Sequence, residues 1–194
     1  EDLYPGEYII EIGKKIIDSN KNEKFDNFDE SLKLLKKESL KHSMDLIKLD
    51  LKKLGIEHDN FFSETELIEN KLVDKAVNHL KKNNYVQEGY LEPPKGEMDK
   101  TWKKTKRLIF KSTLFGDDTD RAMQKNDGSW TYFANDVGYH MDKVNRNYEY
   151  LIDVLGADHT GYVKRITAAV SALSENKVKL NCKVCQLVKL YKNG

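Results

Sequence analysis

The sequence predicts an α/β protein in which a mixed α+β region precedes a parallel sheet. In the first third, apolar residues recur every three or four positions, as they do on the buried face of a helix. From about residue 85 the apolar period shortens to that of strands. The final part predicts a strand over 150–155, a helix over 161–174 and a strand over 178–190. This order implies a right-handed crossover between parallel strands.

Length and charge narrow the possible classes of protein. A chain of 194 residues can build one good core with an inserted subdomain. The net charge of +1 comes from 33 basic and 32 acidic residues, so any contact with RNA must use a local patch. No apolar stretch approaches the roughly 18 residues of a membrane span. We therefore expect a cytoplasmic protein with no membrane contact.

Three helices are predicted before the first strand. Apolar periodicity marks an amphipathic segment over 9–17 and a longer one over 32–54. Gly55 stands where a left-handed cap would end the second helix. A third helix is predicted from 64 to 80, ending at residues 83–84.

Short strands follow at 85–91, 107–111 and 121–124. After the last of these, Asp127 and Gly128 predict a tight hairpin, because this pair supplies the positive φ angles that the turn requires. Residues 135–147 then predict a helix. Either Asn135 or Asp136 could serve as its N-cap.

The two cysteines, Cys182 and Cys185, do not predict a metal or redox site. A zinc site of this spacing needs a second pair of ligands, and none is evident. The run over 178–184 alternates apolar and polar residues as a half-buried strand does, so sulfurs three positions apart would point to opposite faces. We expect a reduced cytosolic protein without a bound metal.

The sequence GADHTGY, at residues 156–162, follows a buried-strand pattern and precedes a helix. Ligands of open α/β sheets bind at the carboxyl ends of strands, which is where this turn lies. Gly156 would let a ligand approach the backbone, Asp158 can accept from hydroxyl or ammonium groups, and His159 can donate or accept. The alternative is an ordinary strand-to-helix turn with a polar cap.

A second group lies about twenty residues upstream. Tyr132, Asp136, Tyr139 and His140 are separated by four, three and one positions, so on a helix they share one face. A core stripe is usually aliphatic, whereas two phenols, a carboxylate and an imidazole suit a polar ligand.

Two charged segments complete the candidates. Residues 116–121 (GDDTDR) lack the spacing of a calcium loop, and we interpret them as an acidic turn with Arg121 as its partner. Residues 102–107 (WKKTKR) could form a phosphate-binding patch, although a solvated loop edge is the preferred interpretation.

Taken together, these segments resemble the catalytic domain of bacterial arginyl-tRNA synthetases, a class I family. The motifs that carry the resemblance are GADHTGY, TYFANDVGYHMDK at 131–143, GDDTDR and EDLYPGEYI at 1–9. The resemblance implies the second half of a class I Rossmann-like nucleotide-binding fold with a mixed α+β insertion. It implies a helical part of the catalytic domain over 1–28, an insertion over 29–128 and the Rossmann-like half over 129–194. The stretch near 89–106 fits the family poorly.

The resemblance also assigns roles to individual residues. Tyr132, Asp136 and His159 match positions that bind the substrate arginine, whose guanidinium requires carboxylates and hydroxyls around it. Tyr139 and His140 are expected to support that site. Gly156, Asp158 and His159 match the wall of the ATP cleft. No catalytic residue and no metal ligand is assigned within the chain.

The implied enzyme is arginine–tRNA ligase, which activates arginine with ATP and Mg²⁺ and transfers it to tRNA(Arg). The HIGH and KMSKS signatures of class I synthetases do not occur here, so we expect a central fragment of the catalytic domain that is monomeric and inactive alone. The alternative is a non-catalytic module that binds RNA or protein.

Overall fold

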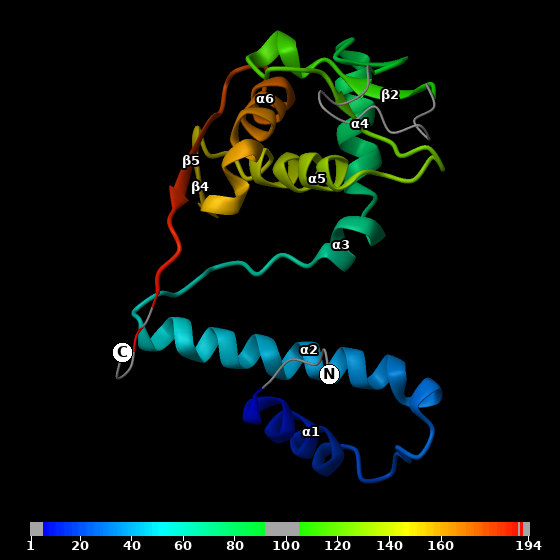
Figure 1. The fold of residues 1–194 in the computed structure, drawn as a ribbon, viewed down its shortest axis with the longest axis vertical. Coiled ribbons are helices and arrows are strands. Elements are labelled where there is room, and N and C mark those ends of the chain that lie inside the picture. Colours follow the sequence, from blue (N-terminus) through cyan, green and yellow to red (C-terminus); the bar gives the residue numbers. More distant parts are fainter. Residues whose placement is uncertain (1–5, 92–104, 190, 192–194) are drawn as a thin grey trace. The chain divides into compact units, whose positions relative to one another are not determined.

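The computed structural model describes residues 6–91, 105–189 and 191, which form a mixed α/β fold. The chain divides into two compact units, one ending at Phe61 and the other beginning at Phe62. Figure 1 shows the elements of each unit. The division at 61–62 differs from the boundaries after residues 28 and 128, which the family resemblance implies. Those boundaries stay predictions.

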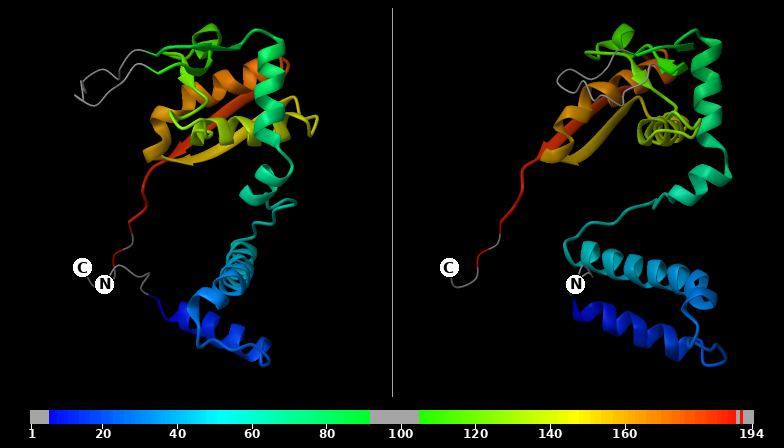
Figure 2. Two further views of the ribbon diagram at one scale, coloured as in Figure 1. Left: turned by 90° about the vertical axis from the view of Figure 1, so that its right-hand side faces the viewer. Right: turned by 45° about the vertical axis from the view of Figure 1, so that its right-hand side comes forward.

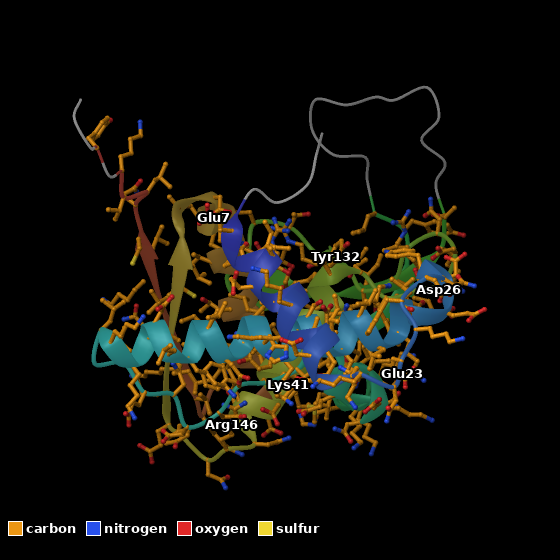
Figure 3. All side chains as sticks on the ribbon, turned by 90° about the horizontal axis from the view of Figure 1, so that it is seen from below. Glu7, Glu23, Asp26, Lys41, Tyr132 and Arg146 are labelled. Carbon is orange, nitrogen blue, oxygen red and sulfur yellow. The ribbon has the colours of Figure 1, made fainter. Side chains whose placement is uncertain are left out.

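The N-terminal unit contains two helices, α1 (Glu7–Ser19) and α2 (Phe28–Lys53), which confirm the first two predicted helices. Helix α1 buries Ile12 and Ile16, one turn apart. Asn27 caps α2 because its side chain accepts from two backbone N–H groups of the first turn. The connection between the helices includes the labelled residues Glu23 and Asp26 (Figure 3).

Gly55 ends α2 in the way the sequence predicts. Its φ angle is +75°, in the left-handed region that a side chain would disfavour. The N–H of Gly55 donates to the carbonyl of Lys52, and that of Ile56 donates to the carbonyl of Leu51. This pair of bonds satisfies two carbonyls at the end of the helix.

The third predicted helix is wrong as a single element. The structure contains α3 (Glu64–Glu69) and α4 (Leu72–Lys82), separated by Lys71 with a φ angle of +50°. Lysine does not favour this conformation, so nothing in the local sequence predicts the break. The apolar periodicity therefore predicted one continuous helix. The break changes the direction of the chain and sets α3 against the helix that carries the candidate site (Figure 1).

Three short antiparallel strands follow in the order β1 (Val86–Gly89), β2 (Arg107–Phe110) and β3 (Arg121–Ala122). The predicted hairpin is confirmed by a bridge between Gln124 and Trp130. Its loop differs in detail, because Gly128 has a positive φ angle and Asp127 does not. Instead, the Asp127 carboxylate accepts from the backbone N–H and the hydroxyl of Ser129.

Helix α5 (Tyr132–Val144) begins three residues earlier than predicted. Its N-cap is Thr131, not Asn135 or Asp136, because the Thr131 hydroxyl oxygen accepts from the N–H of Ala134 at 3.2 Å. The N–H of Thr131 donates to the carbonyl of Met123, beyond β3, at 3.0 Å. A pairing with the preceding chain therefore sets where the helix begins.

The predicted βαβ unit consists of β4 (Tyr150–Gly156), α6 (Val163–Leu173) and β5 (Lys179–Cys185). The strands are parallel and pair from Tyr150–Lys179 to Gly156–Cys185, which confirms the parallel sheet. A 3₁₀ helix, η2 (Ala157–Tyr162), lies between β4 and α6. Figures 1 and 2 show α5 and α6 beside the two strands, with β4 and β5 running together.

The core of the C-terminal unit joins both sheets through three helices. Side chains from α4, β2, α5 and α6 meet there, and the ring of Phe110 stacks on that of Phe133 with centroids 6.1 Å apart. The largest fully buried side chains of this core are Phe110, Leu80, Met123, Ile166, Val77 and Val137.

Of the helices in the described part of the chain, none is both long and apolar enough to cross a membrane. Cys182 and Cys185 are unpaired on β5, with Cys185 more exposed than Cys182. Burial, as the largest cause, raises the pKa of the Cys182 thiol.

Gly138→Ala should destabilise the protein. A Cβ at Gly138 would lie 3.0 Å from the Cα and the N of Val73, so α4 approaches α5 backbone to backbone. Overpacking of this kind costs about 1–3 kcal/mol, more than the helix propensity of about 1 kcal/mol that alanine contributes. Denaturant unfolding followed by circular dichroism measures the change.

Gly13→Ala is the matched control, because Gly13 lies inside α1 and a Cβ there meets no atom within 4 Å. It should be neutral or stabilising. A Gly138→Ala variant as stable as the original chain would show that the two helices can separate without cost.

Candidate functional site

Of the four candidate residues on α5, only Asp136 and Tyr139 line a common cavity. Asp136 and Tyr139 line a cavity of about 340 Å³ between α3 and α5. Tyr132, the first residue of α5, is 81% exposed and is not among the lining residues. The ammonium of Lys125 lies 5.7 Å from the centroid of its ring. Figure 3 labels Tyr132.

Glu64 is a cavity residue that sequence reasoning missed. It stands in the first turn of α3, whose N-cap is Ser63, and it lines the same cavity as Asp136. No local pattern marks it, since its place depends on the break at Lys71. Among the residues that the structure describes, the cavity is lined by Phe62, Glu64, Leu67, Asn135, Asp136 and Tyr139.

The lining of this cavity suits a long cation. Two carboxylates, an amide and a phenol surround it, while Phe62 and Leu67 supply apolar wall. The ring of Phe62 lies against that of Tyr139 with centroids 4.8 Å apart, which restricts the phenol. A guanidinium offers five donors and a flexible apolar chain, so it matches acceptors at one end and apolar contact along the stem.

His140 lies away from the cavity, between α5 and β4. It is buried, and its Nδ1 lies 2.8 Å from the carbonyl oxygen of Asp136. Its Nε2 lies 2.8 Å from Oδ2 of Asp153, and Lys143 Nζ donates to Oδ1 of the same carboxylate at 2.7 Å. Burial by itself would raise the pKa of Asp153, but the hydrogen bonds from His140 and Lys143 outweigh it and lower the pKa to about 2.

The turn after β4 carries the second group of candidates. Gly156 ends the strand, and a Cβ there would lie 2.5 Å from Oδ1 of Asp158, so this carboxylate occupies the space above the glycine. Asp158 and His159 are both exposed, with His159 Nε2 3.4 Å from Asp158 Oδ2. Both side chains are open to a ligand.

Tyr162 connects the two groups. Its ring lies 6.3 Å from that of Phe133 on α5 and 6.4 Å from that of His159 on η2, measured between centroids. Its hydroxyl is buried and makes no hydrogen bond of good geometry within the described residues. Burial first, and then the nearby Asp136 carboxylate, raise the pKa of Tyr162 well above its ordinary value. The residues around Tyr162 therefore include both Asp136 and His159.

The acidic turn is structural, as the sequence predicts. The Arg121 guanidinium donates to both carboxylate oxygens of Asp117, each at 2.7 Å, and the Ser112 hydroxyl donates to the same carboxylate. Burial opposes ionisation of Asp117, but the bond from Arg121 lowers its pKa. Lys164 on α6 binds Asp118 at 2.7 Å.

Part of the basic run lies outside the described residues, namely 102–104. Lys106 pairs with Glu88 on β1, and Arg107 donates to Thr105 and Asn126. The described part of this run is therefore engaged within the protein. No cluster of three or more His, Cys, Asp or Glu that could hold a metal ion occurs in the described ranges.

No protein-family model matches the chain, but individual proteins do. It is 56% identical over 193 residues to the arginine–tRNA ligase of Pelagibacter ubique, a match that covers 100% of this chain and 33% of that protein. It is 48% identical to the corresponding enzyme of Roseobacter denitrificans, with 100% and 34% covered. The crystal structure of a putative arginyl-tRNA synthetase from Campylobacter jejuni matches with a TM-score of 0.76 and 28% identity, covering 100% of this chain and 39% of that one.

The chain is homologous over its whole length to a segment of arginine–tRNA ligases. This confirms the resemblance carried by its motifs. The chain spans about a third of the length of the curated arginine–tRNA ligases that it matches. Its mixed α/β fold is consistent with a fragment of such an enzyme.

The Asp153 carboxyl should titrate with a midpoint near pH 2, well below the value of about 3.9 for a free aspartate. A carboxyl whose pKa is lowered by folding stabilises the protein above the unfolded pKa, and this stability is lost as the pH falls from about 4 towards 2. Side-chain ¹³C NMR across this range measures the midpoint.

Lys143→Gln provides the comparison, because it removes one of the two donors and should move the midpoint upward. A midpoint at or above pH 4 in the unmodified chain would mean that burial outweighs the two hydrogen bonds.

Proposed function

We propose that this chain is the central part of an arginine–tRNA ligase, in which it supplies the arginine pocket and one wall of the ATP cleft. The observation that carries the proposal is the cavity lined by Asp136 and Glu64, on a chain that matches arginine–tRNA ligases along its whole length. Two carboxylates beside a phenol and an amide match the donors of a guanidinium.

The proposed arginine site consists of Asp136 and Glu64 as charge partners, with Tyr139 restricting the pocket. Tyr132 and His159 are not among the residues that line the cavity, and in the proposed site they would contact the rest of the amino acid or close over it. Supporting contacts come from His140, which binds the carbonyl of Asp136. Phe62 and Leu67 would pack against the methylene groups of the substrate.

The proposed ATP wall is the turn formed by Gly156, Asp158 and His159. Support comes from its place at the carboxyl end of a parallel strand, where nucleotide ligands of α/β sheets bind. In this reaction the arginine carboxylate displaces pyrophosphate from the α-phosphate of ATP. The chain's residues would bind and orient the two substrates. Holding the reacting groups in the right geometry lowers the barrier of such a displacement. Mg²⁺ would enter with ATP and neutralise phosphate charge.

The same proposal covers the architecture and the partners. The unit β4–α6–β5 would belong to the second half of a class I Rossmann-like fold over 129–194, with an α+β insertion over 29–128 and a helical part over 1–28. The complete enzyme would act on tRNA(Arg) in the cytoplasm as a monomer.

Asp136→Asn should raise the KM for arginine strongly and that for ATP little. The variant is made in a chimeric ligase, in which residues 1–194 replace the corresponding third of the Pelagibacter ubique enzyme. Losing the charge partner of a desolvated guanidinium costs about 2–5 kcal/mol, so the KM should rise about thirtyfold or more. Steady-state aminoacylation kinetics measure both constants.

Asp142→Asn is the control, because Asp142 lies on the same helix and pairs with the partly exposed Arg146. It should leave both KM values close to those of the chimeric ligase. Equal changes for arginine and ATP in Asp136→Asn would mean that Asp136 is part of the scaffold and does not bind the substrate.

The isolated chain should neither aminoacylate tRNA(Arg) nor exchange pyrophosphate with ATP. By the resemblance, the signatures that handle the phosphates of ATP are not among its 194 residues. Pyrophosphate exchange with and without arginine and tRNA measures this, with the chimeric ligase as the active control. Arginine-dependent exchange by the isolated chain would contradict the assigned division of roles.

A further inference from the structure

We propose that Asp153 is a positioning residue of the guanidinium pocket, acting through His140 and Lys143 on Asp136 and Tyr139. The inference rests on the proposed function of the pocket and extends it to a carboxylate on a neighbouring strand. Asp153 does not line the cavity. Each of its two oxygens begins a contact path that ends on a residue that does.

The first path runs through His140. Asp153 Oδ2 faces Nε2 of His140 at 2.8 Å, and Nδ1 of the same ring faces the carbonyl oxygen of Asp136 at 2.8 Å. Both ring nitrogens face acceptors, so the path is complete when both carry a proton. Asp136 is one helical turn before His140, and the ring therefore fixes the backbone that bears the proposed charge partner of arginine.

The second path runs through Lys143. Its ammonium donates to Asp153 Oδ1 at 2.7 Å and lies 4.6 Å from the centroid of the Tyr139 ring. A cation held at this distance over a ring is attracted to its face. Tyr139 is one helical turn before Lys143. Its ring therefore contacts both this cation and the ring of Phe62.

Burial makes both paths rigid. The side chains of His140, Asp153 and Lys143 are 7%, 10% and 16% exposed. A buried charge that loses its partner is strongly destabilising. Arrangements of these side chains that separate Asp153 from its partners are therefore costly. Asp153 also lies within β4, where pairing with β5 fixes its backbone at Cys182. The contacts with Asp153 thus set the rotation of α5 relative to the parallel strands, and with it the direction in which Asp136 and Tyr139 face.

Asp153→Asn in the chimeric ligase tests the proposal. The substitution keeps the size of the side chain and removes its charge. We expect the KM for arginine to rise about tenfold, because small displacements of positioning groups have effects of up to about a hundredfold. The KM for ATP and kcat should change less than about threefold. Asp118→Asn, which breaks the exposed pair with Lys164, is the matched control and should change none of these three constants.

A purely structural role predicts a different result. In that case Asp153→Asn would lower the melting temperature while the KM for arginine stayed unchanged, and the proposal would be overturned. Should Asp153→Asn fail to fold, Lys143→Gln removes only the path to Tyr139 and should raise the KM for arginine by a smaller factor. An unchanged KM in Lys143→Gln would then overturn the proposal.

A double variant separates this inference from the proposed function. If Asp153 acts through Asp136, Asp153→Asn should raise the KM for arginine by a smaller factor in the Asp136→Asn variant than in the unmodified chimeric ligase. If Asp136→Asn raises the KM for arginine and Asp153→Asn does not, only this inference fails. If Asp136→Asn leaves the KM unchanged, the proposed arginine site itself fails.

Discussion

The C-terminal unit depends on how helix α5 is held along its length. At its start, the Thr131 hydroxyl accepts from the first turn of the helix and also lies 3.0 Å from the carbonyl of Ala122, in β3. In its middle, the bare backbone at Gly138 lets α4 approach. Towards its end, His140 and Lys143 bind the carboxylate of Asp153 on β4. One helix therefore fixes the antiparallel strands, a neighbouring helix and the parallel strands in one arrangement.

Periodic segments were predictable from sequence because burial on one face imposes a regular spacing. The parallel pair β4–β5 and the helices α1 and α2 are examples. Element boundaries were not, because they depend on contacts outside the segment. The start of α5 is set by the pairing of Thr131 with the chain after β3, and the break between α3 and α4 by a left-handed Lys71. The local sequence around Thr131 or Lys71 does not predict that a helix begins or breaks there.

The candidate site shows the same division. Asp136 and the turn around His159 belong to motifs that resemble a known family, and both lie beside Tyr162. Glu64 belongs to no recognisable motif, and its place in the lining depends on α3 being a separate helix that ends before Lys71. Asp153 offered a weak signal: it is the one charged residue within the apolar run over 151–155, and a charge in a half-buried strand requires partners.

The outer face of β4 has a consequence for handling the protein. Tyr150, Ile152 and Val154 alternate with inward-facing residues and are all more than half exposed. Parallel sheets are normally covered on both faces. A bare row of such side chains beside an open strand edge favours contact between molecules over contact with water. Molecules of the 194-residue chain would therefore tend to associate through this face, and the extent of association would rise with protein concentration.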